Sequence, residues 1–221
     1  MLVRSWNLFH GNTLPPRRRA YLREMVELVT ADRPDVVCLQ EVPAWALTRV
    51  GAWADMHVLP ALARHASLGP LPIPAELGRA LTAPHHGVIR SAFAGQGNAV
   101  LVARERRVLA HAELPLPAPE PRVAQRVDLD GLVVVNVHFS NPPRGDNELA
   151  AVLEWVGDAG PLVIAGDFNT TPRLDGFTGT LPGIDQVLVR GADAHARVWP
   201  TGDRQLGELV LSDHAPVEAE F

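Results

Sequence analysis

The chain has 221 residues, a formal charge of -5 and a single cysteine. One cysteine excludes an intrachain disulfide, and the acidic balance gives the protein no general electrostatic attraction to nucleic acid. Cys38 lies in an apolar run, which indicates a buried side chain, and no apolar run approaches the roughly 20 residues of a membrane span. We therefore expect a monomer in the reducing cytoplasm, without a signal peptide or a transmembrane segment.

The first part of the chain alternates between β-prone apolar runs and helical patterns. Residues 2–7 and 35–40 predict strands, and the second run is apolar throughout, which is typical of a strand buried on both faces. Apolar side chains at helical spacing predict helices over residues 17–30 and 43–55. Strand, helix and strand therefore follow one another at the start of the fold.

Residues 59–86 contain five prolines and predict a surface excursion with one helical turn near residues 75–81. Beyond it, an Asp130-Gly131 pair between two apolar runs indicates a β-hairpin. Strands are predicted over residues 98–103, 107–114, 122–129, 132–139, 162–165, 185–190 and 215–221, and a helix over 147–156. We infer an α/β (α+β) fold, a four-layer αββα sandwich in which two packed mixed sheets are flanked by helices. No linker divides the chain, so residues 1–221 form one predicted domain.

Polar residues suited to phosphoester chemistry stand at the ends of the predicted strands. They are Asn7, Glu41, His138, Asp167, Asn169, Asp185, Asp213 and His214. Each alone has an ordinary structural explanation, such as a turn former for Asn7, a helix-start carboxylate for Glu41 or an Asx turn for Asp167. Gathered at one rim of a sandwich, these carboxylates, amides and imidazoles predict a single rigid site.

Hydrolysis of a phosphoester explains this mixture of side chains. The reaction requires neutralised negative charge, an activated water and a protonated leaving group. Several carboxylates and only one cysteine favour Mg²⁺ over Zn²⁺. We therefore expect Mg²⁺ as the cofactor, with Mn²⁺ as the alternative.

Six short motifs follow one another along the whole chain. They are SWN at 5–7, LQE at 39–41, NVHFSN at 136–141, GDFN at 166–169, IDQVLV at 184–189 and SDHAPV at 212–217. Their order and spacing resemble the endonuclease/exonuclease/phosphatase superfamily, which includes DNase I-like nucleases, exonuclease III-like repair enzymes, neutral sphingomyelinases and inositol polyphosphate 5-phosphatases. The resemblance implies a DNase I-like αββα sandwich that hydrolyses phosphoester bonds.

The resemblance also implies how the metal and the water would be held. Glu41 would be the main metal ligand, with Asp213 and Asn7 near the ion or its waters, and Asn7 would also be within reach of the substrate. Asp167 would orient and deprotonate the attacking water. Asn169 would hold a phosphate oxygen and the Asp167 side chain.

A second group of residues would contact the phosphate. His214 would do so with its charge favoured by Asp185, and His138 would be a second acid or phosphate contact. Asn141 would add a hydrogen bond. Arg126, beside the catalytic strand, either pairs with the phosphate or is an ordinary charge on the strand face.

Two positions depart from the exonuclease III-like branch of the superfamily. That branch usually has Tyr where this chain has His138, and Asp where it has Phe9. Both differences point away from abasic-site repair. Glu76 is a candidate acidic partner for His138 if its loop folds back.

Three hypotheses for the function follow. The first is a metal-dependent phosphodiesterase or nuclease that attacks phosphorus with a metal-activated water. The alternative is a phosphomonoesterase or a lipid phosphodiesterase, whose substrate is a small phosphorylated molecule or a phospholipid headgroup instead of nucleic acid. The third, a binding module without catalysis, is disfavoured because all the core residues are present.

Overall fold

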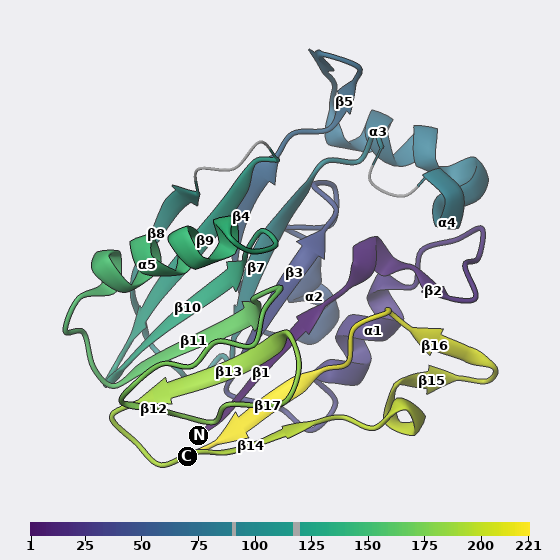
Figure 1. Cartoon of the computed structure of the whole chain (residues 1–221). Coiled ribbons are helices and arrows are strands. Elements are labelled where there is room, and N and C mark those ends of the chain that lie inside the picture. The colour runs from purple at the N-terminus through teal and green to yellow at the C-terminus, as the bar shows by residue number, and fades with distance from the viewer. Residues whose placement is uncertain (90–91, 117–119) are drawn as a thin grey trace.

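The structure of the protein is a computed structural model and describes residues 1–89, 92–116 and 120–221. Two six-stranded sheets form its centre, with the orders β14-β17-β1-β3-β7-β4 and β12-β13-β11-β10-β9-β8 (Figure 1). The first sheet consists of β1 (Leu2–Asn7), β3 (Val36–Val42), β4 (His57–Arg64), β7 (Gln96–Val102), β14 (His195–Val198) and β17 (Val217–Glu220). The second consists of β8 (Val108–Leu116), β9 (Arg122–Leu129), β10 (Leu132–His138), β11 (Leu162–Asp167), β12 (Phe177–Thr178) and β13 (Asp185–Arg190).

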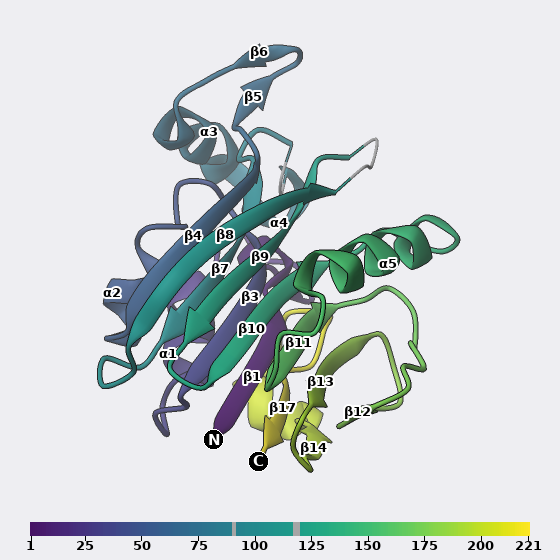
Figure 2. The same cartoon turned by 90° about the vertical axis from the view of Figure 1, so that its left-hand side faces the viewer.

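Helices cover the outer face of each sheet (Figure 2). They are α1 (Leu22–Val29) and α2 (Val50–Ala54) on the first sheet and α5 (Arg144–Val156) on the second. Side chains of α1 and α2 pack with Trp6 and Leu39, and those of α5 pack with Val135. A third apolar cluster, which includes Cys38 and Val134, fills the space between the sheets. These clusters confirm the predicted αββα sandwich and the buried cysteine.

Strand direction brings the polar strand ends to one rim. β1 runs parallel to β3, and β10 runs parallel to β11, so each pair ends at the same edge of its sheet. β13 is antiparallel to β11 and therefore begins where β11 ends. The other pairings are antiparallel, which makes both sheets mixed.

The prediction of a surface excursion over residues 59–86 is wrong in its first part. β4 pairs with β7 at the edge of the first sheet, and Pro60 lies opposite Ala99 within that ladder. An edge strand tolerates a proline. The prolines of this segment therefore did not exclude a strand, although they predicted a loop. The remainder forms an arm that projects from the sandwich (Figure 1). It consists of β5 (Ser67–Leu68), β6 (Leu71–Pro72), α3 (Ala75–Thr82), η2 (Ala83–His85) and α4 (His86–Ile89).

Two predicted helices are shorter than expected. α1 begins only at Leu22, because the carbonyls of Arg17 and Arg18 each accept a 2.9 Å hydrogen bond, from the N–H groups of Gly87 and His86. This contact with α4 uses the carbonyls of the preceding segment, which is irregular and contains bends instead of helical turns. The second predicted helix is helical only over α2, with turns before it.

Smaller elements complete the chain. They are η1 (Phe9–Gly11), β2 (Thr13–Leu14), η3 (Thr201–Arg204), β15 (Gln205–Leu206) and β16 (Leu209–Leu211). The two ends of the chain lie side by side, and the N–H of Phe221 donates to the carbonyl of Met1 at 3.1 Å (Figures 1 and 2). Within the described ranges, no helix is both long enough and apolar enough to span a bilayer.

Candidate functional site

Three side chains of the second sheet are neighbours at its rim because of strand register. His138 ends β10, Asp167 ends β11 and Asp185 begins β13. His138 is paired with Asp167, and Asp167 with Asp185. The Nε2 atom of His138 lies 3.6 Å from Oδ2 of Asp167. The register of this sheet therefore places three of the predicted site residues side by side.

The first sheet contributes Asn7 and Glu41. The fully buried Asn7 donates from Nδ2 to Oδ2 of Asp167 at 3.0 Å and to Oε1 of Glu41 at 3.3 Å. Oε1 of Glu41 is also 3.9 Å from Nε2 of His138. One amide thus links carboxylates from the two sheets.

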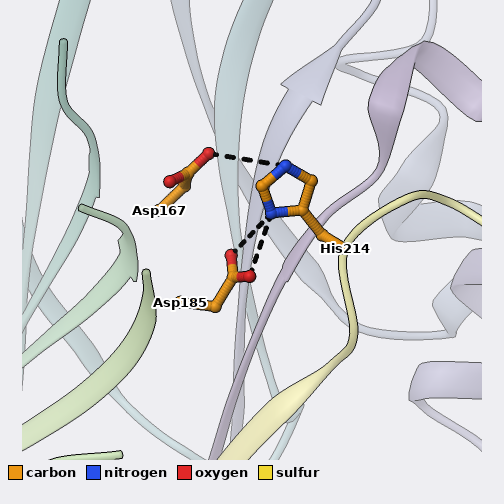
Figure 3. A group of neighbouring side chains, drawn as sticks. All are labelled: Asp167, Asp185 and His214. Carbon is orange, nitrogen blue, oxygen red and sulfur yellow. Dashed lines mark hydrogen bonds and ion pairs between the residues drawn. The ribbon is translucent and has the colours of Figure 1, made fainter. Parts of the chain in front are cut away.

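His214 joins the site from the turn that precedes β17 (Figure 3). Its Nδ1 lies 3.0 and 2.9 Å from the two carboxylate oxygens of Asp185, and its Nε2 lies 3.8 Å from Oδ2 of Asp167. Burial opposes the charged ring, but the hydrogen bond and the charge of Asp185 outweigh it and raise the pKa of His214 to about 9. The imidazole is therefore oriented and positively charged at neutral pH.

The carboxylates of the site are crowded and poorly hydrated. Burial raises the pKa of Glu41 to about 7, and the charges of Asp213 and Asp167 act in the same direction. Burial and the charge of Asp185 likewise raise the pKa of Asp167. A divalent cation would relieve this concentration of negative charge, and carboxylate and amide oxygens are ligands that Mg²⁺ and Mn²⁺ accept. The side chains present therefore fit such an ion.

Two positions for a cation can be compared. Asp167, Asp185 and His214 offer ligand atoms that lie within 4.8 Å of one another. However, Asp185 already holds Nδ1 of His214, and a protonated imidazole has no lone pair for a metal. At the other position, the Glu41 carboxylate faces the amide of Asn7 and Nε2 of His10, and the charge of Asp213 acts on it. An ion there would use carboxylate oxygens without separating Asp185 from His214.

Unusual backbone conformations gather around the site. Among the described non-glycine residues, seven have positive φ, and five of these are Phe9, His10, Glu41, Asn169 and Ser212. All five follow or flank the strand ends that form the site. Such conformations cost free energy and persist only where the surroundings enforce them, which indicates that packing and hydrogen bonds hold these loops in place.

Hydrogen bonds hold two of these loops in place. Asn169 donates from its N–H to Oδ1 of Asp167 at 2.9 Å and from Nδ2 to the carbonyl of Phe139 at 2.8 Å. Ser212 donates from Oγ to the carbonyl of Asn7 at 2.7 Å. These bonds fix Asp167 and connect the turn before β17 to β1, so the site is preorganised.

The structure brings eight predicted residues together at this rim. They are Asn7, Glu41, His138, Asp167, Asn169, Asp185, Asp213 and His214. Asn141 lies beside the group, in a neighbouring cavity.

Arg126 and Glu76 lie outside this group of contacts. The guanidinium of Arg126 is bonded to Asp128 of the same strand at 2.6 Å, and its position on β9 is opposite Val135 rather than the rim. Glu76 is exposed on α3 and pairs with Arg49 at 2.6 Å. The carboxylates that face His138 are instead Glu41 and Asp167.

Sequence reasoning missed two residues at the site. His10 is buried, and its Nε2 lies 3.1 Å from Oε2 of Glu41. Arg122 donates from Nη1 to the carbonyl of His138 at 3.4 Å, and burial together with the positive charge of Arg122 lowers the pKa of His138. Both follow the strand-end pattern, since His10 lies just after the first strand and Arg122 begins β9.

Sequence comparison decides the family. Residues 5–214 match the Endonuclease/Exonuclease/phosphatase family. The chain belongs to this family. As a member of the endonuclease/exonuclease/phosphatase family, it is a hydrolase of phosphoester bonds, which confirms the resemblance carried by its six motifs. No curated protein matches its sequence.

Solved structures share the family fold at low sequence identity. An endonuclease/exonuclease/phosphatase from Beutenbergia cavernae has a TM-score of 0.72 and 19% identity, over 99% of this chain and 70% of that chain. TDP2 from Caenorhabditis elegans has a TM-score of 0.65 and 16% identity, over 99% and 73%. A mannosyl-6-phosphatase from Bacteroides thetaiotaomicron has a TM-score of 0.65 and 13% identity, over 100% and 98%. Such identities establish the DNase I-like fold and leave the substrate open.

Proposed function

We propose that this family member is a divalent-metal-dependent phosphodiesterase of the nuclease type, with Mg²⁺ or Mn²⁺ as its ion. The observation that supports it most is the position of Asp167. Its carboxylate is buried and accepts hydrogen bonds from Asn7 and Asn169, while imidazoles of His138 and His214 stand within 4 Å of the same oxygen. A base so placed, between charge-stabilising groups, suits attack by water on phosphorus.

Each side chain has a chemical task in this proposal. Asp167, whose pKa is raised, accepts the proton of the attacking water. The charged His214, held by Asp185, stabilises negative charge on the phosphate. The neutral His138 donates a hydrogen bond to a phosphate oxygen.

Glu41, with Asn7 and Asp213 beside it, is the proposed ligand set for the ion. When bound there, a divalent cation supplies positive charge for the phosphate oxygens and lowers the pKa of water. The coordination chemistry favours Mg²⁺ or Mn²⁺ because the donors are oxygen atoms.

A lipid phosphodiesterase is the second candidate. The hairpin of β5 and β6 exposes Leu68 and Leu71, which are 51% and 65% accessible, at the end of the projecting arm (Figure 1). Exposed apolar side chains on a projecting hairpin suit contact with a lipid surface.

Hydrolysis of a substrate panel tests the proposal. Plasmid DNA, RNA, sphingomyelin and inositol phosphates would each be incubated with Mg²⁺, with Mn²⁺ and with EDTA. We expect cleavage of nucleic acid with either ion and none in EDTA, and a Glu41→Gln variant that requires much higher metal concentrations. Cleavage of sphingomyelin alone would favour the second candidate. Release of inorganic phosphate alone, or full activity in EDTA, would contradict the proposal.

A further inference from the structure

Arg122 lies at the boundary between two cavities. It lines the cavity of about 210 Å³ that holds His10, Glu41 and His138. It also lines a larger cavity of about 690 Å³ that extends over the N-terminal end of α5. Glu120 borders both cavities as well, so the larger space adjoins the catalytic site.

The guanidinium of Arg122 has few good partners for a buried cation. Its side chain is only 13% exposed. Nη1 reaches the carbonyl of His138 and Nη2 reaches Oε2 of Glu120, both at 3.4 Å, and the buried Nε has no hydrogen-bond partner. An arginine offers five N–H donors in a planar fork that matches the oxygens of a phosphate. The two contacts of 3.4 Å are long for hydrogen bonds, so the Nη donors of this cavity-lining side chain are only weakly engaged.

The larger cavity has a polar lining in which Arg122 and Arg144 stand beside the carboxylates of Glu120 and Glu148. Arg144, Asn141 and Asn147 line it, and no ion pair or hydrogen bond engages the Arg144 guanidinium in the described part of the chain. Its buried carboxylate, Glu148, is already used, because it accepts hydrogen bonds from the N–H and the Oγ of Ser140 at 2.7 and 2.8 Å. The polar donors around this cavity are therefore available to an anionic ligand.

We propose that the larger cavity binds a second phosphate group of the same substrate, held by Arg122 and Arg144. The inference rests on the proposed phosphodiester chemistry, since the first phosphate would occupy the catalytic cavity. It narrows the substrate class to molecules with a further phosphate next to the reacting one. Arg122 and Arg144 are then positioning residues that set this specificity.

Calorimetric binding with paired ligands tests the subsite without turnover. In EDTA, the wild-type protein would be titrated with thymidine 5′-phosphate and thymidine 3′,5′-bisphosphate, and with inositol 1-phosphate and inositol 1,4-bisphosphate. We expect at least one bisphosphate to bind about tenfold more tightly than its matched monophosphate. The pair that shows the preference identifies a nucleotide or an inositol source. Equal or undetectable binding within both pairs would overturn the inference.

Variants then locate the second phosphate. Arg122→Gln and Arg144→Gln should each remove most of the preference for the bisphosphate, whereas Arg122→Lys should keep part of it because the charge remains. Arg107→Gln is the matched control, because Arg107 is exposed at the opposite end of the second sheet, and it should keep the full preference. A preference that survives both glutamine variants would contradict the inference.

Failure of this inference differs from failure of the proposed function. DNA cleavage without any bisphosphate preference would overturn the subsite and leave the phosphodiesterase standing. A bisphosphate preference in a protein that cleaves no diester in the panel would support the subsite and overturn the phosphodiesterase.

Discussion

Asp167→Asn is expected to lower kcat by about 10²–10⁴-fold, the range that general bases contribute. Both oxygens of Asp167 accept hydrogen bonds, from Asn169 and Asn7, so an asparagine of the same shape cannot satisfy both donors. It also lacks the basicity needed to take a proton from water. Steady-state kinetics on the substrate identified by the panel would measure the loss, with circular dichroism to verify the fold.

Asp158→Asn is the matched control for this substitution. Asp158 is an exposed carboxylate beyond the C-terminal end of α5, and its replacement should leave kcat unchanged. If Asp167→Asn retained a kcat close to that of Asp158→Asn, the role given to Asp167 would be wrong.

Asp185→Asn is expected to move the alkaline limit of activity to lower pH. In the wild-type protein the pKa of His214 is raised to about 9, so the ring stays charged at pH 8. Without the Asp185 carboxylate the pKa should fall toward the ordinary value of 6.5, and the ring should become neutral above that pH. The charged fraction at pH 8 would then decrease about thirtyfold, and kcat should follow it.

Profiles of kcat between about pH 5.5 and 9.5 would measure this shift. At the acidic end, where the ring is protonated in both proteins, the kcat of the variant should approach that of the wild type at the same pH. Asp193→Asn, at an exposed turn between β13 and β14, serves as the control and should keep the wild-type profile. Superimposable profiles for Asp185→Asn and the wild type would show that charge on His214 is not required.

The sandwich could be predicted because most of its strands correspond to short apolar runs that can be recognised locally in the sequence. Residues 122–129 and 185–190 form strands with the predicted bounds, and the Asp130-Gly131 turn joins β9 to β10. The strand β4 could not be predicted, because Pro60 is unfavourable in a strand until an edge position in the sheet accommodates it. The start of α1 depends on a contact with α4, which lies far away in the sequence.

The site was predictable where its residues belong to contiguous motifs. Glu41, Asp167 and His214 each stand in such a motif. The parallel pairs β1–β3 and β10–β11, and the antiparallel strand β17 that begins where β1 ends, explain why they meet. Arg122 was missed because its relevance comes from its position between two cavities, which depends on tertiary packing. The sequence left Arg126 either as a phosphate contact or as a charge on the strand face, and in the structure its side chain pairs with Asp128.

The position of the proposed ion is the central question, and anomalous diffraction from crystals grown with Mn²⁺ answers it directly. A peak beside the Glu41 carboxylate, lost in Glu41→Gln crystals, is the predicted result. An ion at that position would leave the Asp185–His214 pair intact, with Nδ1 of His214 still bonded to the Asp185 carboxylate. A peak between Asp185 and His214, or no peak near Glu41, would contradict the account.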